Sequence, residues 1–163
     1  MHLTRRLVPL LALPALGAGI LLASGASAQA PAARTLSFKE LEKRGTFTHV
    51  RNTKTRSQLA NSQGDGIVST VPLADRSGKV VGRLHADCTT TTGARDFRKS
   101  ELMCSGALVL RDGTLTLHAV TSPGSSMTTG TVTGGTGAYA NARGLFHSEG
   151  APGGAQQTIT LAG

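Results

Sequence analysis

The chain has 163 residues and a formal net charge of +8 at pH 7, with 39% hydrophobic and 16% charged residues. This balance argues against an intrinsically disordered protein, because disorder needs low apolar content and high net charge. Beyond the N-terminal 28 residues no apolar run approaches the roughly 20 residues of a membrane-spanning helix, which argues against an integral helical membrane protein. The remaining length fits one domain.

Residues 1–28 are typical of a secretory signal peptide. Arg5 and Arg6 give a basic start, residues 7–22 are apolar, and Ala26 and Ala28 supply the small residues of a cleavage site. We therefore expect cleavage after Ala28 and export to the periplasm or the cell exterior; an uncleaved anchor helix is the alternative. Residues 29–34 are predicted to form a short Ala/Pro linker, and residues 35–163 the folded domain.

After the linker, short segments rich in Thr, Val, Leu and Phe alternate with Gly, Asp, Asn, Ser and Pro. None of them has the sustained 3.6-residue period of a helix, so the sequence predicts an all-β protein. Asp112-Gly113 lies between two alternating runs and predicts a tight hairpin. Short strands at regular spacing are typical of an antiparallel barrel or sandwich. The predicted strands are 35–42, 46–51, 66–72, 79–90, 101–110, 114–121, 128–133, 143–148 and 156–161.

The two cysteines predict one disulfide. An even cysteine count in a small exported domain favours a bridge between Cys88 and Cys104, with two buried free thiols as the alternative. Alternation along the strand places Cys88 on one side with Val80 and Leu84, and Cys104 on one side with Leu108. Both cysteines thus point to the apolar side of their strands, as a cross-strand bridge requires.

One predicted strand carries an acid on its apolar face. In 35–42, Glu40 falls on the same side as Phe38. A carboxylate there costs free energy unless it is paired or protonated, which makes it a candidate for a functional site. In the next strand Phe47, His49 and Arg51 share a face, so His49 or Arg51 is a candidate partner. The alternative is that Glu40 lies at a barrel mouth, in water or in a salt bridge.

Several blocks of the sequence together resemble a known family. They are residues 64–73 (GDGIVSTVPL), 78–83 (GKVVGR), Cys88-Thr89, Cys104-Ser105-Gly106, residues 110–116 (LRDGTLT) and residues 133–144 (TGGTGAYANARG). In this order and spacing they resemble the allene oxide cyclase barrel-like family of bacterial secreted proteins, related to plant allene oxide cyclases and dirigent proteins. The similarity runs from about Leu36 to Leu161, and the last block is the most specific. It implies an eight-stranded antiparallel β-barrel with a central cavity, often trimeric in the plant relatives.

The resemblance also implies a role for Glu40. Plant allene oxide cyclases close an unstable epoxide into a cyclopentenone, and an acid on the first strand steers charge in an apolar cavity. Glu40 matches that acid by position. Glu42 stands where the family has an Asn that helps to hold a water, and this departure argues against the plant reaction in this protein.

Three hypotheses follow. The first is a barrel that binds a small apolar molecule, because many interior candidates are small and leave room for a cavity. These small residues are Gly82, Ala86, Gly106 and Ala119. The second is a cofactor-independent cyclase or isomerase with Glu40 as the catalytic acid. The third is a non-catalytic envelope or structural protein with a filled barrel. The expected ligand-binding residues are Phe38, Glu40, Phe47, His49 and Tyr139. Tyr139 is also expected to pack on a turn or at a barrel end.

No cofactor or metal site is predicted. Residues 135–140 match a dinucleotide fingerprint in form, but the stretch after them is strand-like and carries no acid at the required spacing. The four histidines beyond the leader show no close ligand spacing. With four Phe and one Tyr, the basic chain lacks the aromatic platforms of single-strand nucleic-acid binding. We expect no nucleic-acid partner, at most weak attraction to anionic envelope polymers, and either a monomer or a homo-oligomer.

Overall fold

The computed structural model describes residues 33–52 and 61–163; the predicted signal peptide lies outside this range. The described residues form an all-β structure, as predicted. Its strands are β1 (Arg34–Glu40), β2 (Thr46–Val50), β3 (Gly66–Ala74), β4 (Val80–Thr92), β5 (Glu101–Leu110), β6 (Gly113–Thr121), β7 (Met127–Gly135), β8 (Gly144–Ala151) and β9 (Gly154–Leu161). Three short 3-10 helices accompany them: η1 (Glu42–Arg44), η2 (Phe97–Lys99) and η3 (Gly137–Tyr139). None of the helices described is long and apolar enough to cross a membrane.

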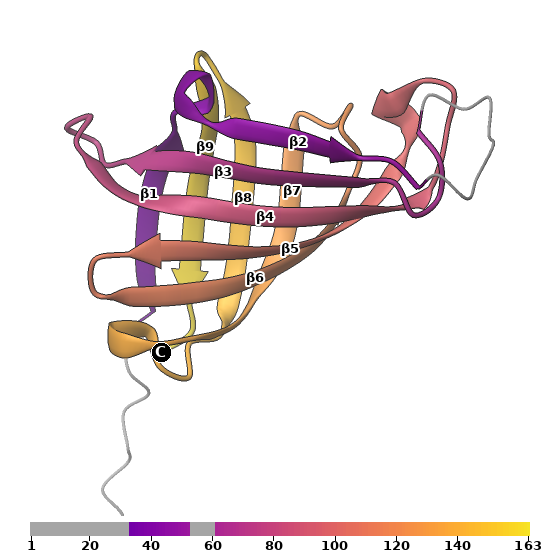
Figure 1. The fold of residues 1–163 in the computed structure, drawn as a ribbon. Helices are drawn as coiled ribbons and strands as arrows, with labels where there is room; N and C mark the ends of the chain where they lie inside the picture. The colour runs from indigo at the N-terminus through magenta and orange to yellow at the C-terminus, as the bar shows by residue number, and fades with distance from the viewer. Residues whose placement is uncertain (1–32, 53–60) are drawn as a thin grey trace, which may run out of the picture.

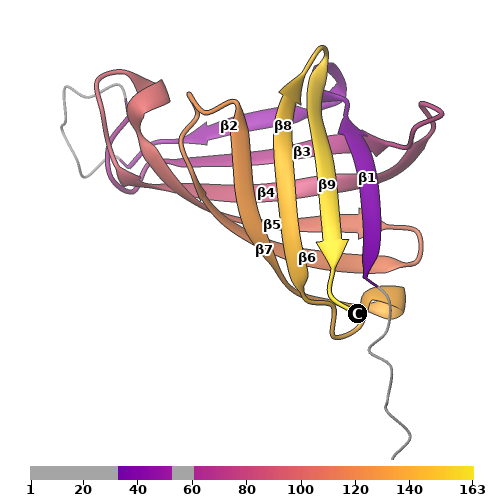
Figure 2. The ribbon, with the colours of Figure 1, turned by 180° about the vertical axis from the view of Figure 1, so that it is seen from behind.

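The strands form one antiparallel sheet that closes into a barrel. Their order is β1-β9-β8-β7-β6-β5-β4-β3-β2, and β1 closes the barrel by also pairing with β3. The closed barrel therefore has eight strands, and β2 is an extra strand that pairs only with β3. Strands β2–β6 form one wall, and β1, β9, β8 and β7 cross them steeply as the other wall (Figures 1 and 2). The eight-stranded barrel that the resemblance implied is confirmed.

Strand β3 changes partners at a proline. Its first half pairs with β2 and its last residues pair with β1. Pro72 lies at the change, and its carbonyl oxygen accepts a hydrogen bond from the Leu41 backbone N–H at 2.9 Å. A proline has no N–H to give to a neighbouring strand, which suits a position where pairing is interrupted. The first strand ends at Glu40, two residues before its predicted end, because η1 begins at Glu42. Glu40 is thereby placed where the barrel closes.

The core lies toward one end of the barrel, where large apolar side chains from both walls meet. Burying one such side chain stabilises a protein by about 1.5–3 kcal/mol. The buried cluster consists of Leu73, Leu108, Leu115, Leu117, Val132, Tyr139, Phe146, Ile159 and Leu161. This end therefore provides most of the apolar stabilisation of the domain.

The disulfide is present as predicted. Cys88 on β4 and Cys104 on β5 are directly opposite in register and are bonded to each other. Leu84 shares the inward face of β4 with Cys88, whereas Val80 is 41% exposed. The predicted inward position of Val80 is therefore wrong. The register shifts between Leu73 and Ala74, and the shift reverses the facing at the start of β4.

The predicted Asp-Gly hairpin is also present. Leu110 pairs with Gly113, so Arg111 and Asp112 alone form the turn between β5 and β6. Gly113 has a φ of 148°, and a Cβ at this position would lie 2.1 Å from the carbonyl oxygen of Thr136. Only glycine fits this conformation and this close approach. The Gly-rich block that begins at residue 133 forms the end of β7 and η3 beside the same hairpin.

Candidate functional site

A cavity of about 170 Å³ lies between the two walls of the barrel and is partly open to solvent. Its apolar lining is made mainly of small groups. Ala86, Gly106 and Ala119 line it from β4, β5 and β6, next to the Cys88–Cys104 disulfide. Because these side chains are short, the wall of β4–β6 leaves space that leucines fill elsewhere in the barrel. The small interior residues that the sequence pointed to do line a cavity, except Gly82, which lies outside it.

Among the described residues, Phe146 supplies the one aromatic ring on the cavity wall. It pairs across the sheet with Gly130, and a Cβ on Gly130 would lie 2.2 Å from the Phe146 ring. The ring therefore lies across the glycine, where any larger residue would displace it. Leu84 and Leu117 line the cavity as well, so most of its surface is apolar.

The polar part of the cavity is a chain of three hydrogen-bonded side chains. Glu40 and Gln157 are 7% and 3% exposed. Gln157 Nε2 donates to Glu40 Oε1 and also to Ser148 Oγ, the latter at 2.8 Å. Register explains the contact with Ser148, because Gln157 on β9 and Ser148 on β8 are directly paired. Three strands of the same wall thus contribute one side chain each.

The environment of Glu40 favours its neutral form. Burial raises the pKa of this carboxyl above its usual value of 4.5, and the negative charge of Glu42 adds to the rise. The hydrogen bond from Gln157 acts in the opposite direction. Glu40 therefore holds its proton to a higher pH than an exposed glutamate does.

The cavity wall also contains polar atoms that differ in their hydrogen bonding. The hydroxyls of Thr121 and Thr128 are bonded to each other at 2.7 Å. Gln157 Oε1 is buried and has no hydrogen-bond partner among the described residues. A buried acceptor without a partner costs free energy, so this oxygen is a position where a further donor would be stabilising.

Of the five predicted ligand-binding residues, the structure brings only Glu40 to the cavity. Phe38 packs against the core and lies along a groove beside the β3–β4 turn. Tyr139 is buried in η3, with the Arg34 guanidinium 5.4 Å from its ring centroid. The expected packing of Tyr139 at a turn of the barrel end is thus confirmed, and it does not line the cavity.

Glu40 is hydrogen-bonded to Gln157, and the candidate pairing with His49 or Arg51 is not found among the described residues. His49 makes an edge-on contact with Phe97 at 6.1 Å between ring centroids, and Phe47 is 55% exposed. Both belong to β2, which pairs only with β3 and is not part of the closed barrel. All five residues of β2 are exposed, so neither side chain is enclosed by the barrel.

Sequence reasoning missed Gln157 and Ser148. Gln157 alternates with Ile159 and Leu161, so it places an amide on an apolar face. This is the same signal that drew attention to Glu40, and it was available in the sequence. Nothing in the sequence pairs Gln157 with Glu40, because they are 117 residues apart and meet only when β9 pairs with β1.

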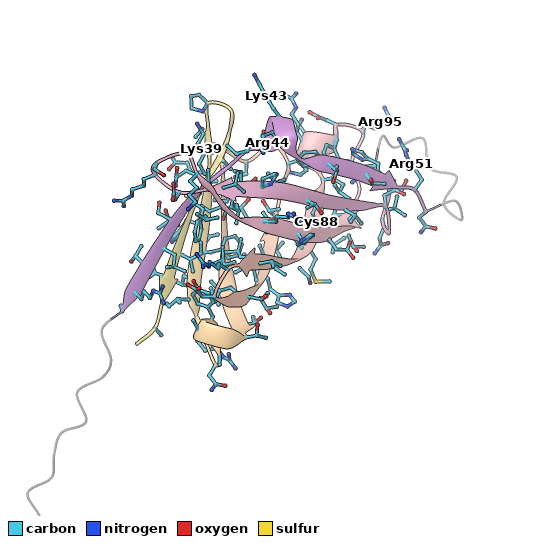
Figure 3. The ribbon with its side chains drawn as sticks, turned by 60° about the vertical axis from the view of Figure 1, so that its left-hand side comes forward. Lys39, Lys43, Arg44, Arg51, Cys88 and Arg95 are labelled. Carbon is cyan, nitrogen blue, oxygen red and sulfur yellow. A yellow bond between two sulfur atoms is a disulfide. The ribbon has the colours of Figure 1, made fainter. Side chains whose placement is uncertain are left out.

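The basic side chains lie on the surface. Figure 3 shows Lys43 and Arg44 on η1 at one end of the molecule and Arg51 and Arg95 further along the same edge, with Cys88 on β4 between the walls. These cations are exposed. In the described ranges the only salt bridge joins Arg98 to Asp96, at 3.3 Å. No group of three or more His, Cys, Asp or Glu side chains within those ranges could hold a metal ion.

No model of a known protein family and no curated protein sequence matches this chain. Solved structures do match it. A pyocyanin demethylase is similar with a TM-score of 0.64 and 23% identity, over 80% of this chain and 100% of its own. A pterocarpan synthase dirigent protein has a TM-score of 0.57 and 18% identity, over 82% of this chain and 94% of its own. An exo-specific intermolecular Diels-Alderase has a TM-score of 0.55 and 17% identity, over 81% and 99%. The chain therefore has the barrel fold found in dirigent and Diels-Alderase proteins.

Proposed function

We propose that this protein binds a small apolar molecule in the cavity of its barrel. The observation that carries this proposal is a hollow of about 170 Å³ with mostly apolar walls and a chain of hydrogen-bonded polar side chains, Glu40, Gln157 and Ser148. Cavities with a few placed polar groups are typical of ligand sites. A dry apolar cavity of about 150 Å³ is known to accept benzene. The enclosed part of the ligand is thus about one ring in size, and a larger ligand would extend through the opening.

The similar solved structures support this choice. By their names they are a demethylase, a synthase of the dirigent type and a Diels-Alderase. A shared fold does not transfer an activity, because function resides in the site and not in the architecture. The names do support a barrel whose interior receives a small molecule over a barrel that is only structural.

A cofactor-independent cyclase or isomerase is the second candidate. The observation that favours it is the buried carboxyl of Glu40, whose pKa is raised by burial. A carboxylic acid that stays neutral in an apolar site can donate a hydrogen bond or a proton to a substrate. In this second candidate Glu40 is the catalytic acid and the cavity walls fix the shape of the substrate.

We propose further that binding takes place outside the cytoplasm. A disulfide between Cys88 and Cys104 fits an oxidising compartment. The signal peptide predicted at residues 1–28 agrees with that compartment. The exposed cations of Figure 3 support weak attraction to anionic envelope polymers, which salt would screen.

Native mass spectrometry of protein purified from its own export route tests the binding proposal. We expect a co-purifying small apolar molecule, which extraction then identifies. The variant Ala119→Leu places a larger side chain in the cavity and should lose this molecule. Val120→Leu is the matched control, because Val120 is the next residue on β6 and is 60% exposed. A bound molecule that survives Ala119→Leu would contradict the proposal.

The same molecule separates the two candidates. If the protein is an enzyme, Glu40→Gln should still bind the molecule but should no longer convert its precursor. Incubation of that precursor with wild type and variant, followed by chromatography, measures the conversion. Turnover that is equal in wild type and variant would remove Glu40 from the catalytic role.

A further inference from the structure

The hydrogen bonds of the Gln157 amide leave one atom available. Both hydrogens of Nε2 are directed to acceptors, one to Glu40 Oε1 and one to Ser148 Oγ. These two contacts come from different strands and fix the orientation of the amide. Oε1 is then the atom without a partner, in a side chain that is 3% exposed and lines the cavity.

Each of the other polar side chains on the cavity wall already takes part in at least one hydrogen bond. The Thr121 and Thr128 hydroxyls bond to each other, and Glu40 and Ser148 accept from Gln157. The cavity thus offers a ligand an apolar surface and one buried acceptor, Gln157 Oε1, that lacks a donor. An apolar ligand would leave that acceptor unsatisfied, whereas a ligand with a donor would satisfy it.

We propose that Gln157 is a specificity residue that selects cyclic ligands bearing a hydrogen-bond donor, with Oε1 accepting from the N–H or O–H of the ligand. This inference rests on the proposed binding function. That function specifies the size of the ligand, and the inference specifies in addition that the ligand carries a hydrogen-bond donor. The Nε2 contacts with Glu40 and Ser148 hold the acceptor in place before the ligand arrives. Such preorganisation reduces the entropy that binding must offset.

Indole and benzofuran are suitable probes, because they have the same shape and differ in one group. Indole carries an N–H donor, and benzofuran has a ring oxygen at that position. The chain contains no Trp, so the fluorescence of indole reports its binding directly, and benzofuran is measured by competition. We expect indole to bind about tenfold more tightly, as one hydrogen bond to an otherwise unsatisfied acceptor allows.

Two variants complete the test. Gln157→Met keeps a similar length without the acceptor and should remove the preference for indole. Gln156→Met makes the same replacement at the neighbouring residue of β9, which does not line this cavity, so the preference should persist. If Gln157→Met does not fold, the ratio of the indole and benzofuran affinities of the wild type decides the question by itself.

The outcomes separate this inference from the proposed function. If neither probe binds, the binding function itself is contradicted. If both bind equally, or if benzofuran binds more tightly, the cavity accepts apolar rings but Gln157 does not select a donor, and the inference is overturned. A tenfold preference for indole that disappears in Gln157→Met and remains in Gln156→Met supports it.

Discussion

The two ends of the barrel interior are built on the same strands but filled differently. On β4, β5 and β6, leucines 84, 108 and 115 stand opposite one another in register. The next inward positions along β4 and β5 carry Ala86 and Gly106, followed by the disulfide, with Ala119 beside it on β6. An eight-stranded barrel is just wide enough for side chains to fill it. A change from leucine to alanine and glycine therefore opens a cavity without any change of backbone.

The two ends also differ in polarity. The filled end is lined by aliphatic and aromatic residues, of which Leu117 and Phe146 also reach the cavity. The hollow end contains in addition Glu40, Gln157 and the Thr121–Thr128 pair. Buried polar groups cost stability unless they are hydrogen-bonded, and here one acceptor is left without a partner. Stability is thus concentrated at one end of the barrel and binding capacity at the other.

Leu115→Ala should have the largest effect on stability. Leu115 is completely buried in the filled end, and removal of such a side chain leaves a cavity that costs about 2–5 kcal/mol. Urea denaturation measures the change in the free energy of unfolding. Leu145→Ala is the control, because Leu145 is 51% exposed on β8 and should change little. Equal losses in the two variants would contradict the close packing of the filled end.

Loss of the disulfide should have the next largest effect. The bridge closes a loop with a sequence separation of 16, for which chain entropy gives about 3 kcal/mol. The double variant Cys88→Ala/Cys104→Ala should therefore unfold at a lower urea concentration. Wild type treated with a reductant should unfold at the same concentration as the double variant. An unchanged midpoint in both would show that the hollow end does not depend on the bridge.

Ala119→Leu should have a smaller effect on stability than Leu115→Ala. The added side chain enters the cavity of about 170 Å³, so it meets less steric resistance than in a filled core. We expect a change in the free energy of unfolding below about 1 kcal/mol, together with a loss of indole binding of more than tenfold. A large destabilisation would mean that the hollow end is already packed.

The strand positions and facing could be read from the sequence because one face of each strand is consistently apolar. Leu84 and Cys88 on β4 illustrate this, since the two-residue period alone fixes their side of the sheet. Val80 could not be read in this way. Its exposure depends on a register shift opposite Leu73 and Ala74, and periodicity carries no information on such a shift.

The site could be predicted only in part. Glu40 was identifiable as an acid in phase with apolar neighbours, and the structure places it on the cavity wall. The hydrogen-bond partner of Glu40 could not be identified from the sequence. His49 is near Glu40 in the sequence, whereas Gln157 comes next to Glu40 only through the pairing of β1 with β9. The exposure of Phe47 likewise follows from β2 lying outside the closed barrel, which depends on where β3 changes partners.

The smallest effect is expected from the charge of Glu40, and it reports directly on the hollow end. Burial raises the pKa of this carboxyl in the folded state, so the folded protein binds its proton more tightly than the unfolded chain does. The free energy of unfolding should therefore fall as pH rises from about 4.5 through the folded-state pKa, and stay level above it. Glu40→Gln has no group that titrates at this position.

The stability difference between Glu40→Gln and wild type isolates this effect. Carboxyls with a lowered pKa, such as Asp65, act in the opposite direction but are present in both proteins, so they cancel in the difference. Urea denaturation of both proteins between about pH 4 and about pH 8 should show a difference that shifts in favour of the variant as pH rises. A difference that does not vary with pH would mean that water solvates Glu40 in the folded protein. The hollow end would then be a wet opening in the barrel and not an apolar binding cavity.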